Sequence, residues 1–228
     1  MEKRHKKTLA RTLDWGAAGA KMGLIAILFV PGFLTVKFVV PQAAKRDPGQ
    51  VANRNEKSRP QQLVKIYSIV KSNRPDIADK EAWKVSMAIR EESAKRNLDP
   101  MLVLAVIKVE SGFRNQAVSP VGARGIMQIM PETGKFLSEE LLRIDGFTTR
   151  SFTPDHLDDP VHNIKLGVYY LDGLKKQFRN LNLALLAYNL GPGEIRNRLD
   201  NNLYFSDDYA AVVLNAYREY KKTQTPAF

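Results

Sequence analysis

Cysteine is absent from the 228-residue chain, and histidine occurs only three times. Without cysteine the protein forms neither disulfides nor thiolate metal sites. Three histidines are too few for a histidine-rich metal site, and the stretch from His156 to His162 is better explained as a solvated loop beside a helix start. We therefore expect no bound metal ion.

Most of the chain also lacks an excess of charge of one sign. The formal net charge is +11, of which residues 1–60 carry +8 and the other 168 residues carry only +3. A nucleic-acid-binding domain needs basic clusters on its folded part. Here the basic residues flank an apolar segment, where the rules of membrane topology account for them. We therefore expect no nucleic-acid partner.

One long apolar run extends from Met22 to Val40 and is interrupted only by Lys37. As a helix it would span roughly 28 Å, close to the ~30 Å hydrocarbon core of a bilayer. The basic residues 1–21 before it predict a cytoplasmic N-terminus, with the rest of the chain outside the cytoplasm. The alternative is a cleaved signal peptide, but the run is long and residues 41–44 offer no small-x-small cleavage site. We favour an uncleaved single-pass anchor over residues 22–40.

Residues 41–60 are polar, contain proline, glycine and asparagine, and show no hydrophobic period. Such a composition predicts a flexible tether, with a typical span of about 25 Å for this length. Residues 223–228 are interpreted as a short tail. The tether would keep the folded part close to the membrane surface.

From Gln61 onward, apolar residues recur at three and four positions, the spacing of one helix face. Asp-Pro pairs at 99–100 and 159–160 are typical helix starts, with an Asp cap followed by proline. The sequence shows no repeats and no alternating strand pattern, so a mostly α fold is expected. Helices are predicted to begin at 61 and to cover 79–96, 99–110, 159–178, 181–189 and 207–222.

Glu110 ends a helix that is apolar on almost all sides, from Met101 to Val109, and that helix should lie at the centre of the domain. Two effects disfavour the ionised form of this glutamate. Apolar neighbours desolvate the carboxylate, and the negative end of the helix dipole repels it. A carboxyl group kept protonated near neutral pH can act as a general acid. The alternative is an ordinary surface glutamate in a last helical turn.

Three short blocks follow in order along the chain: ESGF at 110–113 with AVSPVGARGIMQIMP at 117–131, DPVHNIKLGVYYL at 159–171, and AYNLGPG at 187–193. Together they resemble the lytic transglycosylases of the Slt type, which cleave peptidoglycan and have a lysozyme-like fold. The resemblance covers residues 85–220, within a predicted lysozyme-like domain of residues 61–222.

The resemblance implies functional roles for individual positions. Glu110 matches the catalytic acid–base glutamate of the family. Five further positions match substrate-contacting residues: Ser119, Gln128, Met130, Tyr188 and Asn189. Many members carry a Glu-Thr pair before the last helix, whereas this chain has Asp207 and Asp208 in a shifted register, which leaves their contribution in doubt. Structural alternatives remain: Gly122 and Gly125 for a tight turn, Met127 as core filler, and Tyr188 as a buried helix residue.

The implied reaction needs one carboxyl group and no metal or organic cofactor. Glu110 would protonate the oxygen between N-acetylmuramic acid and N-acetylglucosamine, and the C6 hydroxyl of the muramyl sugar would close a 1,6-anhydro ring. The alternatives are a hydrolytic muramidase on the same fold and a non-catalytic peptidoglycan-binding scaffold. The implied partners are glycan strands, the bacterial inner membrane, and cell-wall or secretion machinery, with the domain in the periplasm.

Overall fold

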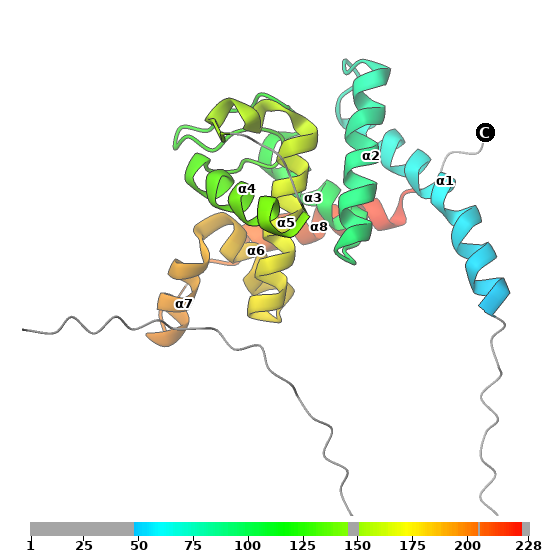
Figure 1. The fold of residues 1–228 in the computed structure, drawn as a ribbon. Coiled ribbons are helices and arrows are strands. Elements are labelled where there is room, and N and C mark those ends of the chain that lie inside the picture. The colour runs from blue at the N-terminus through cyan, green and yellow to red at the C-terminus, as the bar shows by residue number, and fades with distance from the viewer. Residues whose placement is uncertain (1–47, 146–150, 205, 225–228) are drawn as a thin grey trace, which may run out of the picture. The chain divides into compact units, whose positions relative to one another are not determined.

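The computed structural model describes residues 48–145, 151–204 and 206–224, and these residues belong to one compact unit. Helices form nearly all of its regular structure (Figure 1). In chain order they are α1 (Pro48–Asn73), α2 (Asp79–Lys95), α3 (Pro100–Ser111), α4 (Pro131–Asp145), the 3₁₀ helix η1 (Pro154–Asp158), α5 (Pro160–Phe178), α6 (Leu181–Leu190), α7 (Pro192–Asp200) and α8 (Asp208–Lys222).

Helix α3 is the central element, as predicted from its apolar sequence. The Asp99 side chain accepts a hydrogen bond from the Met101 amide at 2.9 Å, and Pro100 occupies the first helical position. Every residue from Pro100 to Ile107 is buried. Helices α8, α2 and α1 pack around α3. The central helix thereby fixes the position of the residues at its own C-terminal end.

The second cap-and-proline signal is confirmed at the start of α5. Asp159 accepts a hydrogen bond from the His162 amide at 2.8 Å, and Pro160 begins the helix. Helix α5 packs against α2, α6 and α4 (Figure 1). Helix α6 is capped by Asn180 and ends at Gly191, as the sequence predicts. Helix α7 begins at the next residue, Pro192, and neither α7 nor α4 is predicted from the sequence.

The segment between α3 and α4 is a small irregular hairpin rather than a helix. Two isolated antiparallel bridges join Val118 to Arg124 and Arg124 to Ile129, and they are the only β pairing in the described parts of the chain. Gly122 and Gly125 have φ values of 90° and 80°, which glycine adopts without strain. The prediction that these two glycines form tight turns is confirmed.

The tether predicted for residues 41–60 is wrong for its second part, because α1 extends back to Pro48. Residues 50–59 contain neither glycine nor proline, so nothing in them breaks a helix. Pro48 stands at the helix start, where a missing N–H costs nothing. Pro60 lies inside the helix, a position that normally costs about 3 kcal/mol. Residues 41–47 and the predicted anchor at 22–40 lie outside the described residues.

None of the helices over the described ranges is both long enough and apolar enough to cross a membrane.

Candidate active site

Glu110 lies in the last turn of α3, one residue before the helix ends at Ser111. Gly112 terminates the helix in the left-handed conformation, with φ of 57°, and donates its amide to the Lys108 carbonyl at 3.1 Å. The carboxyl group is therefore held at the negative end of a rigid, buried helix. The side chain itself is partly buried.

Burial is the main cause of an altered proton affinity at Glu110. Desolvation raises the pKa of its carboxyl group to about 7, and a hydrogen bond from Tyr209 lowers it in part. Among the described residues, no second carboxylate contributes to this shift. A carboxyl group with this pKa is substantially protonated at neutral pH, so it can both donate and take up a proton there.

Tyr209, in the first turn of α8, donates its hydroxyl to the Oε1 atom of Glu110. Burial first, and then the negative charge of Glu110, raises the pKa of this tyrosine, so the hydroxyl keeps its proton. The sequence does not predict a role for Tyr209 and draws attention only to Asp207 and Asp208, which are both exposed. The only available signal was the spacing of Tyr209, Val213 and Ala216 on one face of the last helix.

Tyr188 lies close to Glu110 but does not bond to it. The tyrosine hydroxyl donates to the Met127 carbonyl at 2.9 Å. Burial raises the pKa of Tyr188, and the negative charge of the nearby Glu110 raises it further. Tyr188 is thus a buried helix residue with a satisfied hydroxyl, one of the two interpretations of the sequence, and it also forms part of the surroundings of Glu110.

A cavity of about 200 Å³ is lined by four of the five residues predicted to contact substrate. They are Gln128, Met130, Tyr188 and Asn189, joined by Thr133 and Tyr170. Met130 and Asn189 are exposed there, whereas Met127 is fully buried in the core, as expected. The tyrosine rings of residues 170 and 188 lie 5.4 Å apart between centroids. Aromatic faces beside amide groups suit a polar ligand with apolar faces.

Ser119 is not among the residues that line this cavity. Its hydroxyl oxygen accepts a hydrogen bond from the Ala123 amide at 2.9 Å, and its backbone amide donates to the Ala123 carbonyl at 2.9 Å. Both bonds shape the hairpin. The hydroxyl hydrogen remains available to a ligand, since the oxygen is the acceptor in the side-chain bond.

Gln128 holds the hairpin together from inside. Its Nε2 atom donates to the carbonyls of Ala117 and Gly125, each at 2.9 Å. The residue has φ of 50°, a left-handed conformation that is uncommon for a residue other than glycine. Such strain is typical of functional segments that the surrounding structure over-determines.

Asn163 explains why the second sequence block accompanies the first. It is fully buried in α5, and its Oδ1 accepts the Met127 amide at 2.7 Å. Its Nδ2 donates to the carbonyls of Arg124 and Leu157, each at 2.9 Å. A Cβ atom at Gly125 would lie 2.2 Å from that Nδ2. A side chain at position 125 would therefore collide with the residue that joins the hairpin to α5.

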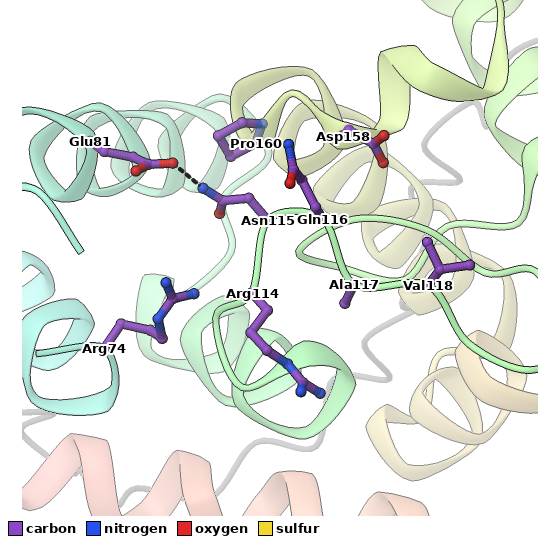
Figure 2. A pocket seen from close by; sticks show the side chains of 9 residues that line it. All are labelled: Arg74, Glu81, Arg114, Asn115, Gln116, Ala117, Val118, Asp158 and Pro160. Carbon is purple, nitrogen blue, oxygen red and sulfur yellow. Dashed lines mark hydrogen bonds between the residues drawn. The ribbon is translucent and has the colours of Figure 1, made fainter. Parts of the chain in front are cut away.

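A second and larger cavity, of about 620 Å³, lies along the loop after Glu110 (Figure 2). Its lining includes Arg114, Asn115 and Gln116 of that loop, and it does not include Glu110.

The chain is similar in sequence to known proteins. Residues 87–210 match the family described as the Transglycosylase SLT domain. The membrane-bound lytic murein transglycosylase C of Shigella sonnei (strain Ss046) is 32% identical over 155 residues, which are 64% of this chain and 42% of that protein. The chain thus spans less than half the length of this curated relative.

Two solved structures show the same fold. The 70 kDa soluble lytic transglycosylase of Escherichia coli is 26% identical with a TM-score of 0.54, over 70% of this chain and 29% of that one. A 70 kDa soluble lytic transglycosylase in complex with bulgecin A is 27% identical with a TM-score of 0.51, over 60% of this chain and 24% of that one. The predicted mostly helical, lysozyme-like fold is confirmed.

Proposed function

Because the chain belongs to the transglycosylase SLT domain family, we propose that it is a peptidoglycan lytic transglycosylase with Glu110 as its single acid–base group. The observation that carries the proposal is the setting of this carboxyl group. It sits at the end of a buried helix with a pKa raised to about 7, at the position that the sequence resemblance assigns to the family's catalytic glutamate. The raised pKa supports the proposal independently, because the family match by itself does not predict it.

In the proposed reaction, Glu110 donates its proton to the glycosidic oxygen between N-acetylmuramic acid and N-acetylglucosamine. The bond from C1 to that oxygen breaks, and the muramyl N-acetyl oxygen stabilises the electron-poor C1. The Glu110 carboxylate then takes the proton of the C6 hydroxyl as O6 bonds to C1. The product is a 1,6-anhydro ring. The C6 hydroxyl proton replaces the one that Glu110 donated, so the reaction needs neither water nor an external nucleophile.

Tyr209 is proposed to orient this proton transfer. Because the tyrosine hydroxyl donates to Oε1 of Glu110, the proton of the neutral carboxyl group belongs on Oε2. The same oxygen then accepts the C6 hydroxyl proton. Tyr209 acts through Glu110 and is a positioning residue rather than a proton donor, since its own pKa is strongly raised.

The sugar would occupy the cavity formed by Gln128, Met130, Tyr188 and Asn189, with Ser119 at the hairpin turn. Mispositioning a bound substrate by about 1 Å can cost on the order of a hundredfold in rate. The hydrogen bonds of Gln128 and Tyr188 to the hairpin backbone support such a positioning role, because they fix the cavity wall.

The experiment is digestion of purified peptidoglycan followed by mass spectrometry. Anhydro products, one water lighter than hydrolysed ones, are expected from the wild type. Glu110→Gln should lose activity by about 10²–10⁴-fold. Glu91→Gln, at an exposed glutamate on α2, is the matched control and should retain activity. Reducing ends would indicate a hydrolytic muramidase instead. Equal turnover by the wild type and Glu110→Gln would refute the role assigned to Glu110, and a wild type without turnover would indicate a non-catalytic scaffold.

The chain is further proposed to be anchored in the bacterial inner membrane through residues 22–40, with its folded part in the periplasm. The length and hydrophobicity of that run and the basic residues 1–21 support this arrangement. The name of the Shigella relative also describes a membrane-bound protein. Fractionation of the full chain and of a chain beginning at Arg46 tests it: only the full chain should remain with the membranes after an alkaline wash.

A further inference from the structure

An aromatic pair joins α1 to α2, two helices that pack against each other (Figure 1). The ring of Tyr67 on α1 stacks on the ring of Trp83 on α2, with 4.2 Å between the centroids and 17° between the planes. Both residues precede the segment 87–210 that matches the family. The match therefore does not account for this pair.

The stack is held in one orientation from the Tyr67 side. The Tyr67 hydroxyl donates to Oδ1 of Asp79 at 2.9 Å, and the same carboxylate oxygen lies 3.0 Å from Nζ of Lys71. The indole of Trp83 thus rests on a ring that is itself fixed by a hydrogen bond. A side chain that is already ordered loses little conformational freedom when a ligand binds to it.

Trp83 keeps one face open to solvent. Tyr67 covers the other face, yet 37% of Trp83 is exposed, so the exposed surface belongs to the open face and to the ring edge. Met87 lies one turn further along α2 on the same face of the helix and is 45% exposed. Tryptophan is highly buried on average, so an open indole face on a rigid support is an unusual surface feature.

The carboxylates beside the stack are paired, whereas one ammonium group is not. Asp79 is paired with Lys71. Asp159 is paired with Lys84 at 3.0 Å. Lys80, one turn before the indole on the same face of α2, is exposed and has no hydrogen bond or ion pair within the described ranges. The surface formed by residues 80, 83 and 87, called here the α2 platform, therefore combines a flat aromatic face with a net positive charge.

These properties suit a sugar chain better than a protein or a lipid surface. Two exposed apolar side chains cannot supply the roughly 800 Å² that each partner buries in a stable protein interface. A membrane contact needs a wider apolar face that enters the acyl chains, whereas this ring is fixed against α1. A pyranose ring is similar in size to an indole, and its partly positive C–H groups are attracted to the negative face of the aromatic ring. The free ammonium group favours a chain that carries carboxylates.

We propose that the α2 platform is a second glycan-binding site, outside the cleavage site, where a sugar ring of a peptidoglycan strand stacks on Trp83 and a carboxylate of the strand pairs with Lys80. The identity of the ligand rests on the proposed function. The position of α2 supports it, because Glu81 accepts a hydrogen bond from Nδ2 of Asn115 in the loop that follows Glu110. The platform thus belongs to a helix that borders the active-site loop, and a strand bound there keeps the enzyme on the wall between cleavage events.

The first test uses the fluorescence of the platform itself. The chain has two tryptophans, Trp15 and Trp83, so Trp83 is the only one in the Trp15→Phe variant. The full chain with this change and with Glu110→Gln, which prevents digestion, is titrated with glycan strands from which the stems have been removed. The emission should move to shorter wavelength, and quenching by acrylamide should fall roughly twofold, because the open face becomes covered. Emission and quenching that do not change would overturn the proposal.

Substitutions at position 83 distinguish an aromatic contact from a merely apolar one. In the Glu110→Gln background, Trp83→Leu should weaken binding to intact sacculi roughly tenfold, whereas Trp83→Phe should retain most of the affinity. Leu142→Ala, at an exposed apolar residue on α4, is the matched control and should leave the affinity unchanged. Co-sedimentation measures the affinities. Unchanged binding by Trp83→Leu, or equal losses in both variants at position 83, would refute the stacking contact.

A neutral glycan tests the charge. Lys80→Gln should weaken binding to sacculi about threefold, as expected for an exposed ion pair, and should not affect binding to chito-oligosaccharides, which have N-acetylglucosamine rings but no carboxylate. Trp83→Leu should weaken the binding of both ligands. Lys80→Gln that binds sacculi as tightly as its parent, or that loses affinity for both ligands equally, would contradict the role of Lys80.

Cleavage of a soluble tetrasaccharide separates this proposal from the proposed function. With Glu110 intact, Trp83→Leu should cleave it at the wild-type rate, because a short substrate occupies only the cleavage site, and this rate also shows that the variant is folded. On sacculi, the KM of the same variant should rise roughly tenfold while kcat stays unchanged. Slower cleavage of the tetrasaccharide would place Trp83 in the cleavage site and overturn the proposal.

The two hypotheses can fail independently. A wild type that cleaves sacculi while strands leave the emission of Trp83 unchanged would refute the platform and leave the activity intact. A wild type whose Trp83 responds to strands, but which forms no anhydro products, would refute the activity and leave the platform.

Discussion

Tyr209 and Glu110 form a pair in which the tyrosine hydroxyl stabilises the charged form of the carboxyl group, against the effect of burial. We expect Tyr209→Phe to raise the pKa of Glu110 further, because the opposing hydrogen bond is lost. The alkaline limb of the pH profile of kcat/KM should therefore move to higher pH. The profile is measured on soluble glycan strands at several pH values.

Tyr217→Phe is the matched control for this prediction. That tyrosine lies on the same helix and donates to Asp99 at 2.9 Å, away from Glu110. Its removal should leave the limb where it is. A shift of the limb to lower pH in Tyr209→Phe would contradict the orientation of the hydrogen bond.

The raised pKa of Glu110 also makes folding stability depend on pH. The folded state binds this proton more tightly than the unfolded chain, whose ordinary value is 4.5, against about 7 in the fold. Stability associated with the neutral group is present in full below about pH 4.5 and is lost as pH rises through 7. Glu110→Gln should thus be more stable than the wild type at pH 8, by up to about 3 kcal/mol, and should match it near pH 4. Urea unfolding at the two pH values measures the difference, and a constant difference would contradict the assigned cause.

Some residues of the site could be predicted from the sequence and others could not. Glu110 could be identified because the features that distinguish it are local in the sequence: an apolar helix before it and a glycine shortly after it. Tyr209 could not, because it lies 99 residues away and reaches the carboxyl group only through the packing of α8 on α3. Gln128 was predicted to contact substrate. Its hydrogen bonds to two hairpin carbonyls could not be predicted, because they depend on a backbone conformation that no sequence pattern indicates.

At the scale of elements, the helix starts predicted at 79, 99, 159, 181 and 207 all lie within one residue of those in the structure, and three of them have a side-chain cap. Asp99, Asp159 and Asn180 each bond to the backbone two or three residues on, which is a purely local interaction. The helix over residues 48–60 was missed because it has no hydrophobic period. Helix α7 was missed because it is nine residues long and buries only Ile195, so its existence depends on its neighbours.

The hairpin between α3 and α4 depends on its contact with α5 in a way that can be measured. Asn163→Ala would remove the side-chain partner of the Met127 amide and of the Leu157 carbonyl in a buried site. It would also remove one of two hydrogen bonds to the Arg124 carbonyl, which still accepts the Ile129 amide at 2.9 Å. We expect a loss of about 3 kcal/mol or more in the free energy of unfolding. Asn182→Ala, at an exposed position on α6, should change it by less than about 0.5 kcal/mol. Denaturant unfolding measures the loss in the free energy of unfolding for each variant. Equal losses would show that Asn163 does not hold the hairpin to α5.

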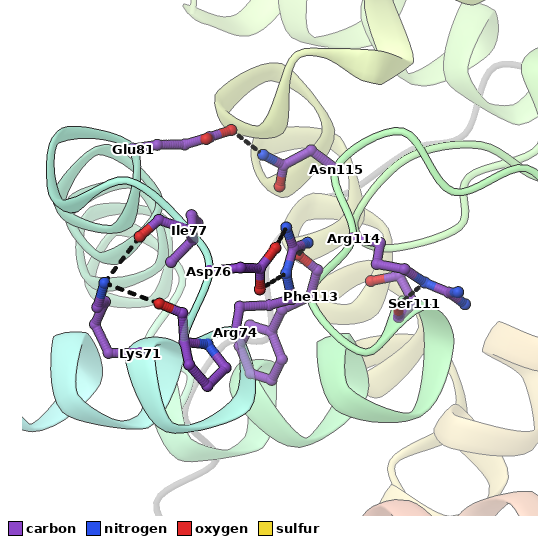
Figure 3. Close-up of polar contacts among 10 residues, drawn as sticks. Lys71, Arg74, Asp76, Ile77, Glu81, Ser111, Phe113, Arg114 and Asn115 are labelled. Carbon is purple, nitrogen blue, oxygen red and sulfur yellow. Dashed lines mark hydrogen bonds and ion pairs between the residues drawn. The ribbon is translucent and has the colours of Figure 1, made fainter.

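At the scale of the whole molecule, the folded unit is larger than the segment that matches the family. The match ends at residue 210, but α8 continues to Lys222 and buries Val213, Ala216 and Tyr220. The match begins at residue 87, but α1 buries Ile66, Ile69 and Val70. A further connection is polar, since Arg74 bonds to the Phe113 carbonyl just after the helix that carries Glu110 (Figure 3).

A fragment of residues 87–210 should therefore fail to fold by itself, whereas a fragment of residues 61–222 should unfold cooperatively. Each large apolar side chain that loses its buried environment costs about 1.5–3 kcal/mol. The five large residues among these six are together comparable to the 5–15 kcal/mol by which a typical domain is stable. Urea titration followed by far-ultraviolet circular dichroism compares the two fragments. A cooperative transition in the shorter one, at the same urea midpoint, would mean that α1 and α8 are accessories of the domain rather than parts of its core.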